Sequence, residues 1–339
     1  MKKIAITFLL LSIPLVLASQ ENFKKFIEVG ISNHDKGRYK EAIKYYKKAL
    51  EIKPNSELAN YEISLSLFSA KEYRKAIKYS NKIIKKGKKH LLPAYINKGS
   101  ALDMLGKTKK SIKVFEEGIK KIGDNYLLHF NLAVNYLKVE NYKKGEIHLK
   151  KAIRDNPVHG SSHFYLAKLN NDKGNKIPTL LASYYFLLIE PNTIRTEEIF
   201  DIFKRVHEGV VKIKDKGGKK NIIVNVNSNS NNEFGAHELM WSMLIASKEL
   251  EENKNKTKEE LFIKNTGDFF EFLGEFSSNK KRNFWNEFYI PFFYKIAKSE
   301  HLETYCKLIT QVEVGSQKWL DENEKKVKVF FNWANKEFK

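Results

Sequence analysis

A short motif recurs along the first half of the 339-residue chain with a nearly constant period. Its first copy is Gly37-x-Tyr39-x-x-Ala42, and related copies begin at Glu72, Gly106 and Asn141. Aligning the copies gives five units of 34 or 35 residues, which start at Phe23, Glu57, Leu92, Tyr126 and Gly160. One such unit is too small to bury an apolar face by itself, so neighbouring units must stack and share a core.

The apolar residues within a unit are spaced as on one face of a helix. In the first unit, Ala42, Tyr46 and Ala49 stand at positions i, i+4 and i+7, which lie on the same side of an α-helix. A glycine, which tolerates positive φ, stands where a tight turn is expected, at Gly37, Gly106 and Gly174. The pattern therefore indicates helices that are joined by tight turns.

These units resemble tetratricopeptide repeats (TPR), a family of 34-residue helix–turn–helix units. The family prefers a small residue at unit position 8, Ala at position 20 and Pro at position 32, where the first unit has Gly30, Ala42 and Pro54. The fifth unit departs from this pattern, because Pro178 opens its second helix and Thr179 takes position 20. The resemblance implies an all-α fold, a TPR α-solenoid of about five units over residues 23–192.

In TPR proteins, fixed positions of the first helices line a concave groove, which the resemblance places here at Tyr61, Leu65, Phe68, Ile96, Met104, Phe130 and Val134. These side chains are mostly apolar, and the Lys, Asn and Arg that clamp a C-terminal carboxylate in chaperone-binding TPR domains are missing. An apolar groove suits an apolar or helical segment of a protein or peptide partner. The alternative is that the C-terminal half of this chain fills the groove.

The positive charge of the chain is concentrated in the repeats. The formal net charge is +21, and residues 19–160 hold 31 Lys and Arg against 15 Asp and Glu, whereas residues 161–339 hold 28 against 25. The excess falls on the second helices, off the apolar stripe, and suits anionic partners such as acidic proteins, lipid headgroups or envelope polymers. A solvated lysine face is the alternative. Nucleic acid fits the charge but not an exported protein.

The N-terminus has the pattern of a secretory signal peptide. Lys2 and Lys3 precede an apolar run from Ile4 to Ala18, which is shorter than the ~20 residues that span a bilayer. We expect residues 1–18 to be removed before Ser19 and the protein to be exported to the periplasm or cell envelope, with no transmembrane span after cleavage. The only cysteine is Cys306, so a lipoprotein is not expected.

The second half is predicted to hold two further parts. Residues 193–233 contain a capping helix at 196–206, a β-hairpin of strands 210–214 and 222–226, and an Asn/Ser-rich loop at 225–232. Residues 234–339 form a helical C-terminal domain, with helices at 234–254, 257–275, 282–299, 301–312 and 316–336. The aromatic residues crowded into this domain predict a packed core.

The chain shows no convincing catalytic, metal or cofactor motif. His159 and His163 are four residues apart, but Pro157 and Gly160 place the first in a turn. His301 and Cys306 are five apart and point to different faces of a helix. The favoured function is therefore an exported scaffold or adaptor without enzymatic activity, cofactor or metal, its oligomeric state open. The alternative is an envelope enzyme with its site in the C-terminal domain and repeats that recruit substrate.

Overall fold

The computed structural model describes residues 2–208, 211–216, 219–224, 233–277 and 282–337. It divides into two compact units, Met1–Asp155 and Asn156–Lys339. The fifth predicted helix pair thus belongs to the same unit as the helices of the C-terminal region. The predicted domain boundaries at residues 192/193 and 233/234 stay predictions.

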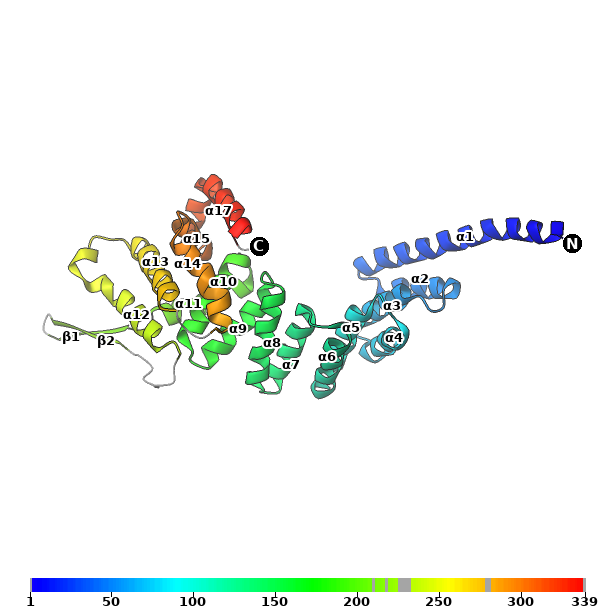
Figure 1. The fold of residues 1–339 in the computed structure, drawn as a ribbon, viewed down its shortest axis with the longest axis horizontal. Helices are drawn as coiled ribbons and strands as arrows, with labels where there is room; N and C mark the ends of the chain where they lie inside the picture. Colours follow the sequence, from blue (N-terminus) through cyan, green and yellow to red (C-terminus); the bar gives the residue numbers. More distant parts are fainter. Residues whose placement is uncertain (1, 209–210, 217–218, 225–232, 278–281, 338–339) are drawn as a thin grey trace. The chain divides into compact units, whose positions relative to one another are not determined.

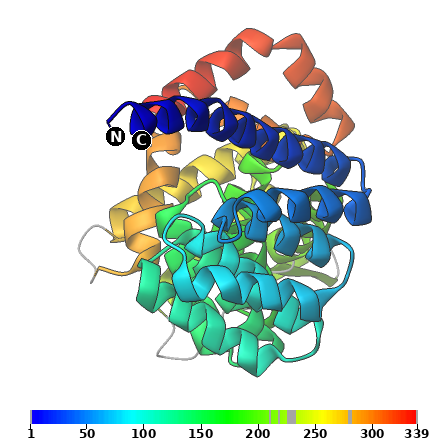
Figure 2. The same cartoon turned by 90° about the vertical axis from the view of Figure 1, so that its right-hand side faces the viewer.

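The first unit consists of helices that pack in consecutive pairs (Figure 1). Their bounds are α1 (Lys2–Asp35), α2 (Tyr39–Ile52), α3 (Glu57–Ser69), α4 (Tyr73–Lys86), α5 (Leu91–Met104), α6 (Thr108–Ile122), α7 (Tyr126–Lys138) and α8 (Tyr142–Asp155). Within this unit successive pairs also pack on one another, through α2 and α3, α4 and α5, and α6 and α7, and Figure 2 shows α2 beside α3. With α9 (Gly160–Asp172) and α10 (Lys176–Ile189) of the second unit, the five predicted helix pairs are confirmed.

The turn inside every pair has the same left-handed backbone. The residues in this conformation are Gly37, Lys71, Gly106, Glu140 and Gly174, with φ between 59° and 73°. They are 34 or 35 residues apart, so the period of the sequence reappears in the backbone geometry. Three of the five are the glycines expected from the sequence, and in the second and fourth pairs a lysine and a glutamate take the same conformation.

The core of the first unit lies between the helices of each pair. Ala42, Tyr46 and Ala49 of α2 are buried, as their spacing predicts. The Tyr46 ring lies so close to Gly30 that a Cβ atom there would stand 2.3 Å from Cε1 of the ring. Gly99 and the Phe115 ring repeat this arrangement in the third pair, also at 2.3 Å. A glycine at this position lets an aromatic ring pack directly on the neighbouring backbone.

The predicted signal segment is continuous in backbone with the first repeat, since α1 begins at Lys2 and ends at Asp35. The side chains of residues 1–18 lie outside the described part of the structure, and cleavage before Ser19 stays a prediction. Among the described residues, we find no helix with the length and apolar character that crossing a bilayer requires.

The second unit packs further helices onto α9 and α10. They are α11 (Ile194–Glu208), α12 (Gly235–Ala246), the 3₁₀ turns η1 (Ser247–Glu249) and η2 (Glu251–Asn253), α13 (Lys258–Ser277), the π-turn η3 (Trp285–Tyr289), α14 (Ile290–Ala297), α15 (Leu302–Ile309), α16 (Val314–Glu322) and α17 (Glu324–Glu337). Strands β1 (Val211–Lys216) and β2 (Lys219–Val224) pair antiparallel, with Val211 opposite Val224. The predicted loop 225–232 lies outside the described residues.

One predicted helix of the C-terminal region ends early and another is interrupted, and side-chain hydrogen bonds explain both. The helix predicted for 234–254 ends at Ala246, where Ser247 Oγ donates to the Leu244 carbonyl (2.6 Å). The helix predicted for 316–336 is two helices, because Asn323 Nδ2 donates to the Trp319 carbonyl (2.8 Å) and the backbone turns there. Such side chains compete with the backbone for hydrogen bonds and favour helix ends.

Candidate binding site

The seven residues predicted to line the groove lie on the first helices of three consecutive pairs. Helix α3 carries three of them, and α5 and α7 carry two each. We call this set the first-helix face: Tyr61, Leu65, Phe68, Ile96, Met104, Phe130 and Val134. Six are half-buried, and Met104 is 56% exposed. The helical spacing at 61, 65 and 68 places these side chains on one side of α3.

Some of this face is engaged in packing between helices. The Tyr61 ring stacks on His90 at a centroid distance of 5.8 Å, and the Phe68 ring meets Tyr73 edge-on at 5.4 Å. Ile96 packs against the core of the third pair. Met104 at the end of α5 is the member with the most accessible apolar surface. That these residues contact a partner stays a prediction.

A ladder of buried polar groups, which the sequence did not indicate, joins neighbouring pairs. The Ser64 hydroxyl donates to the Ala76 carbonyl (3.0 Å) and accepts from Ser80 Oγ (2.7 Å) within the second pair. Asn97 of the third pair also donates to it (2.8 Å). The link recurs one pair later, where Asn135 Nδ2 donates to Ser111 Oγ. Because buried polar groups tolerate few alternative partners, these bonds fix how successive pairs align.

A relay of three titratable residues crosses the fourth pair, from the exposed Asp124 through the buried His129 to the half-buried His148. Asp124 Oδ1 lies 2.9 Å from His129 Nε2, and His129 Nδ1 lies 2.9 Å from His148 Nδ1. Burial lowers the pKa of both imidazoles, that of His148 to about 4. His129 is buried, so its imidazole has no access to a substrate and the relay is part of the packing. Sequence reasoning missed it because the two histidines are far apart and belong to no motif.

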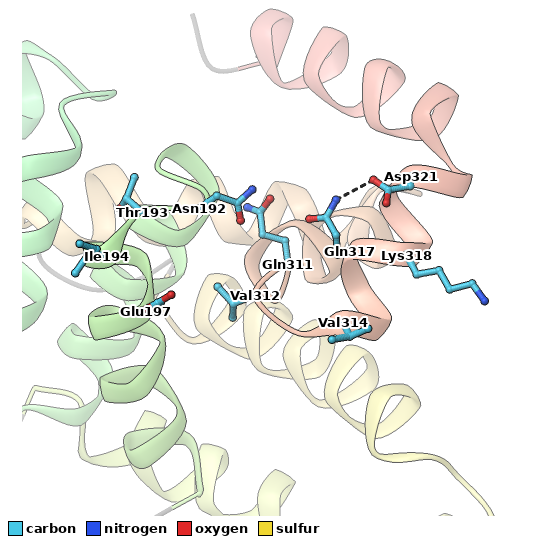
Figure 3. Close-up of a pocket in the computed structure, with 10 residues that line it drawn as sticks. All are labelled: Asn192, Thr193, Ile194, Glu197, Gln311, Val312, Val314, Gln317, Lys318 and Asp321. Carbon is cyan, nitrogen blue, oxygen red and sulfur yellow. Dashed lines mark hydrogen bonds between the residues drawn. The ribbon is translucent and has the colours of Figure 1, made fainter.

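A pocket of about 730 Å3 opens in the second unit, between the start of α11 and the turn from α15 to α16 (Figure 3). Its lining consists of Asn192, Thr193, Ile194, Glu197, Gln311, Val312, Val314, Gln317, Lys318 and Asp321. Ile194 and Val314 are each 86% exposed. Asp321 accepts a hydrogen bond from Gln317 (2.8 Å), and Lys318 extends away from the rest (Figure 3). The lining combines exposed aliphatic side chains with amides, two carboxylates and one lysine.

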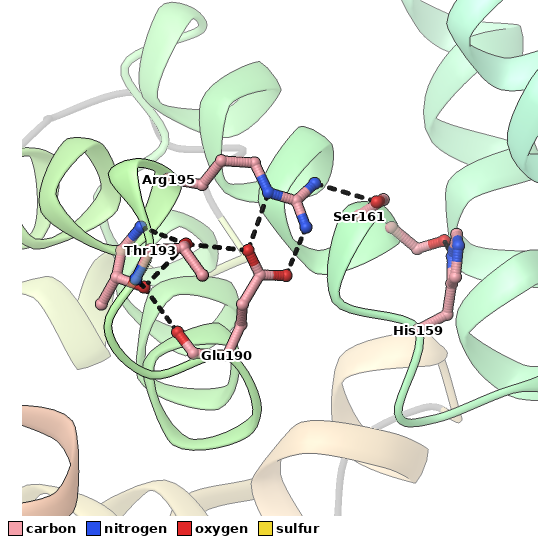
Figure 4. Close-up of polar contacts among 7 residues, drawn as sticks. His159, Ser161, Glu190, Thr193 and Arg195 are labelled. Atoms are coloured by element: carbon pink, nitrogen blue, oxygen red, sulfur yellow. Dashed lines mark hydrogen bonds and ion pairs between the residues drawn. The ribbon is translucent and has the colours of Figure 1, made fainter. Parts of the chain in front are cut away.

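A polar network closes the turn between α10 and α11 (Figure 4). Arg195 Nε donates to Glu190 Oε1 (2.8 Å), and its Nη1 donates to Ser161 Oγ (2.9 Å). Thr193 Oγ1 donates to the same carboxylate (3.0 Å). A Cβ at Gly160 would stand 2.5 Å from Glu190 Oε2. With its oxygens held by these donors, Glu190 links α9, α10 and α11 and is a structural carboxylate.

The histidines considered as metal ligands are held by packing contacts. His159 Nδ1 lies 2.8 Å from Ser162 Oγ. His163 is buried, its Nε2 lies 2.8 Å from the Pro157 carbonyl, and its Nδ1 lies 2.6 Å from Tyr289 Oη. Burial lowers the pKa of His163 to about 3. Within the described ranges, the His, Cys, Asp and Glu side chains form no group of three or more that could hold a metal ion.

The aromatic residues of the C-terminal region form a core on α10. Tyr184 lies 4.9 Å from Phe203, 5.1 Å from Phe270 and 5.8 Å from Phe293, measured between ring centroids. Cys306 is buried beside this core, and burial raises the pKa of its thiol, which opposes a thiolate nucleophile. The predicted aromatic core is present, and it offers the enzyme alternative no support.

Comparison with known proteins supports the repeat assignment. The family model of anaphase-promoting complex, cyclosome, subunit 3 matches residues 35–118. The TPR repeat-containing protein MJ1428 of Methanocaldococcus jannaschii is 33% identical over 117 residues, which make up 34% of this chain. Together with the five helix pairs, these matches support a protein of the TPR type. The chain carries tetratricopeptide repeats. The matched part spans only 19% of the length of MJ1428.

Solved TPR structures resemble this TPR protein over roughly half of its length. The TPR protein TTC0263 of Thermus thermophilus has 16% identity and a TM-score of 0.44, over 54% of this chain and 98% of its own. PilF of Pseudomonas aeruginosa has 16% identity and a TM-score of 0.48, over 57% of this chain and 92% of its own.

Proposed function

We propose that this TPR protein is an exported adaptor of the cell envelope, which binds protein or peptide partners through the first-helix face. The observation that supports the proposal is the partial exposure of apolar side chains on three successive first helices, α3, α5 and α7. Side chains on stacked pairs form a continuous surface that a single partner can follow. The basic second helices offer a second surface.

The chemistry of the first-helix face favours an apolar or amphipathic segment as the bound element. Leu65, Ile96, Met104 and Val134 supply aliphatic contacts and Phe130 an aromatic ring. Burying apolar area contributes about 25 cal/mol per Å2, so a few hundred Å2 give several kcal/mol before ordering costs are subtracted. Met104 is flexible and polarizable, as expected of a residue that adapts to different side chains.

Quantitative capture from an envelope fraction tests the proposal. Tagged full-length protein, Met104→Asp and Ile147→Asp serve as baits, and captured proteins are compared by mass spectrometry. Ile147 is the matched control, because it is an aliphatic residue on a second helix with 46% exposure. We expect Met104→Asp to lose partners that Ile147→Asp retains. Equal capture by all three baits would show that the first-helix face is not the binding site.

The export part of the proposal has its own test. N-terminal sequencing of protein purified from the producing cells should give a chain that begins at Ser19, in the envelope fraction. A chain that retains Lys2 and Lys3 and fractionates with the cytosol would refute export while leaving binding at the first-helix face open.

A further inference from the structure

We propose that helix α4, with the loop that follows it, is a docking surface for anionic lipid bilayers. The inference concerns a different surface from the first-helix face and does not depend on peptide binding there. Every charged residue of α4 is basic, and the helix contains Arg74, Lys75, Lys78, Lys82, Lys85 and Lys86. Lys88 and Lys89 follow in the loop, and no Asp or Glu occurs between Glu72 and Asp103.

The six basic residues of α4 share one side of the helix. At about 100° of rotation per residue, they fall within an arc of about 120°. All six are exposed, as are Lys88 and Lys89. The buried residues Ala76, Ser80 and Ile83 occupy the opposite side. The positive charges are therefore collected on one outward-facing stripe instead of being spread around the helix.

The other second helices of the first unit lack this property. Acidic residues are mixed with the lysines at Glu41 and Glu51 of α2, Glu116 and Glu117 of α6, and Glu146 of α8. A negatively charged side chain next to a lysine reduces the positive electrostatic potential at that part of the surface. The charge pattern thus singles out α4 and its loop within a generally basic unit.

Two carboxylates belong to the surroundings of the stripe, and both already have partners. One directly precedes α4 in the sequence, and the other contacts the loop after α4. Glu72 forms an ion pair with Lys75. Glu57 accepts hydrogen bonds from the backbone N–H groups of Lys88 and Lys89, both at 2.9 Å. Both lysine side chains are exposed, so the positive stripe continues past the end of α4.

The residue types favour a diffuse anionic surface over a shaped ligand. Seven of the eight cations are lysines, which act as point charges, whereas arginine recognises carboxylates and phosphates through paired hydrogen bonds. Clusters of four to eight basic residues on a helix are typical of anionic lipid binding. Single-stranded nucleic acid would need exposed rings for stacking, but Tyr79 is half-buried beneath Lys82, whose Nζ lies 4.3 Å from the ring centroid.

Vesicle co-sedimentation of the full-length protein tests the inference. Vesicles of equal parts phosphatidylglycerol and phosphatidylcholine are compared with pure phosphatidylcholine, at low and high salt. The variant Lys78→Gln/Lys82→Gln/Lys85→Gln removes three charges from the stripe. Lys318→Gln/Lys325→Gln/Lys328→Gln removes three exposed lysines of the second unit, so it matches the change in net charge. Direct binding of a 150-bp DNA fragment and of an acidic peptide by the same three proteins is measured in parallel.

We expect the wild type to bind the anionic vesicles only, and high salt to release it because exposed charges are screened. The α4 variant should bind about a hundredfold more weakly, while the matched variant should keep wild-type affinity. Equal losses in both variants would mean that net charge alone causes binding and would overturn the inference. Loss of DNA or acidic-peptide binding in the α4 variant, without vesicle binding by the wild type, would assign the stripe to another partner and equally overturn it.

Discussion

His129 and His148 share a hydrogen bond between their Nδ1 atoms, which are 2.9 Å apart in the fourth helix pair. Because His129 Nε2 lies 2.9 Å from Asp124 Oδ1, we assign the proton of the neutral His129 ring to Nε2. His129 Nδ1 is then the acceptor, and His148 Nδ1 donates. A proton added to His129 would place two N–H groups against each other and break the link between α7 and α8.

This relationship predicts that the fourth pair loses stability in mild acid. Burial lowers the pKa of His148 to about 4 and also lowers that of His129, although Asp124 opposes the latter shift. Between pH 6.5, the unfolded value, and about 4, the unfolded chain binds protons that the folded chain does not. Above pH 6.5 the two neutral histidines therefore make their full contribution to the free energy of unfolding. As the pH is lowered through this window, the free energy of unfolding falls by roughly 1 to 3 kcal/mol.

Amide hydrogen exchange of α7 and α8 at pH 7.5 and 5 measures this effect locally. Tryptophan fluorescence cannot measure it, because all four tryptophans lie in the second unit. That unit also contains His163 and His207, whose pKa values are lowered as well. After correction for intrinsic exchange rates, protection should fall at pH 5 in the wild type and change less in His148→Gln, which keeps a side-chain donor. Identical pH dependence in both proteins would show that the histidine pair is not the cause.

Replacing the non-glycine residues in the left-handed turns should stabilise the first unit. Lys71 and Glu140 have φ of 61° and 59°, a conformation that costs an L-residue roughly 1 kcal/mol. Lys71→Gly and Glu140→Gly should each raise the free energy of unfolding by about 0.5 to 1 kcal/mol. Urea titration followed by circular dichroism measures the change.

The opposite substitution is the matched control for these turns. A Cβ at Gly37 would meet no atom within 4 Å, while φ there is 71°, so Gly37→Ala tests the backbone alone. It should destabilise by a similar amount. If the two glycine substitutions and Gly37→Ala all shift stability in the same direction, backbone strain does not explain the turns.

Ser64 should matter more for stability than its size suggests. Its hydroxyl bonds to Ala76, Ser80 and Asn97, so Ser64→Ala leaves two buried donors without an acceptor and should cost about 1 to 3 kcal/mol. Ser32→Ala, at an exposed position of α1, should change stability by less than about 0.5 kcal/mol. Equal urea midpoints for the two variants would contradict the role of Ser64 in aligning pairs two and three.

Tyr289→Phe should weaken the packing of the C-terminal helices on α9. His163 Nε2 carries a proton for the Pro157 carbonyl, so its Nδ1 accepts from Tyr289 Oη at 2.6 Å. Removing the hydroxyl leaves a buried acceptor unpaired, at a cost of about 1 to 3 kcal/mol. Tryptophan fluorescence in urea follows this unit, and Tyr294→Phe is the half-buried control. A midpoint for Tyr289→Phe equal to that of Tyr294→Phe would contradict the assignment.

The helix pairs could be predicted from the sequence because each unit repeats the spacing of apolar residues that two packed helices require. Their starts at Glu57, Tyr126 and Gly160 agree with α3, α7 and α9. The sequence predicted the left-handed turns only where glycine marks them, and a lysine or glutamate gives no such signal. The helix ends at Ser247 and Asn323 depend on side-chain bonds to nearby carbonyls, which hydrophobic periodicity does not register.

For the candidate site, the sequence could place side chains on helices but could not pair them across helices. The seven residues of the first-helix face stand on α3, α5 and α7 as expected, because unit position determines the side of a helix. The contact between His129 and His148 joins two helices and depends on ring orientation. The role of Tyr184 as the centre of the aromatic core likewise depends on three separate helices, α11, α13 and α14.

Site-specific photo-crosslinking in the cells that produce the protein tests whether the first-helix face binds partners. A benzoylphenylalanine is placed at Met104 in one strain and at Ile147 in another. We expect a discrete crosslinked protein from position 104 and none from position 147. Crosslinks that are absent from position 104, or equal at both positions, would contradict binding at the first-helix face.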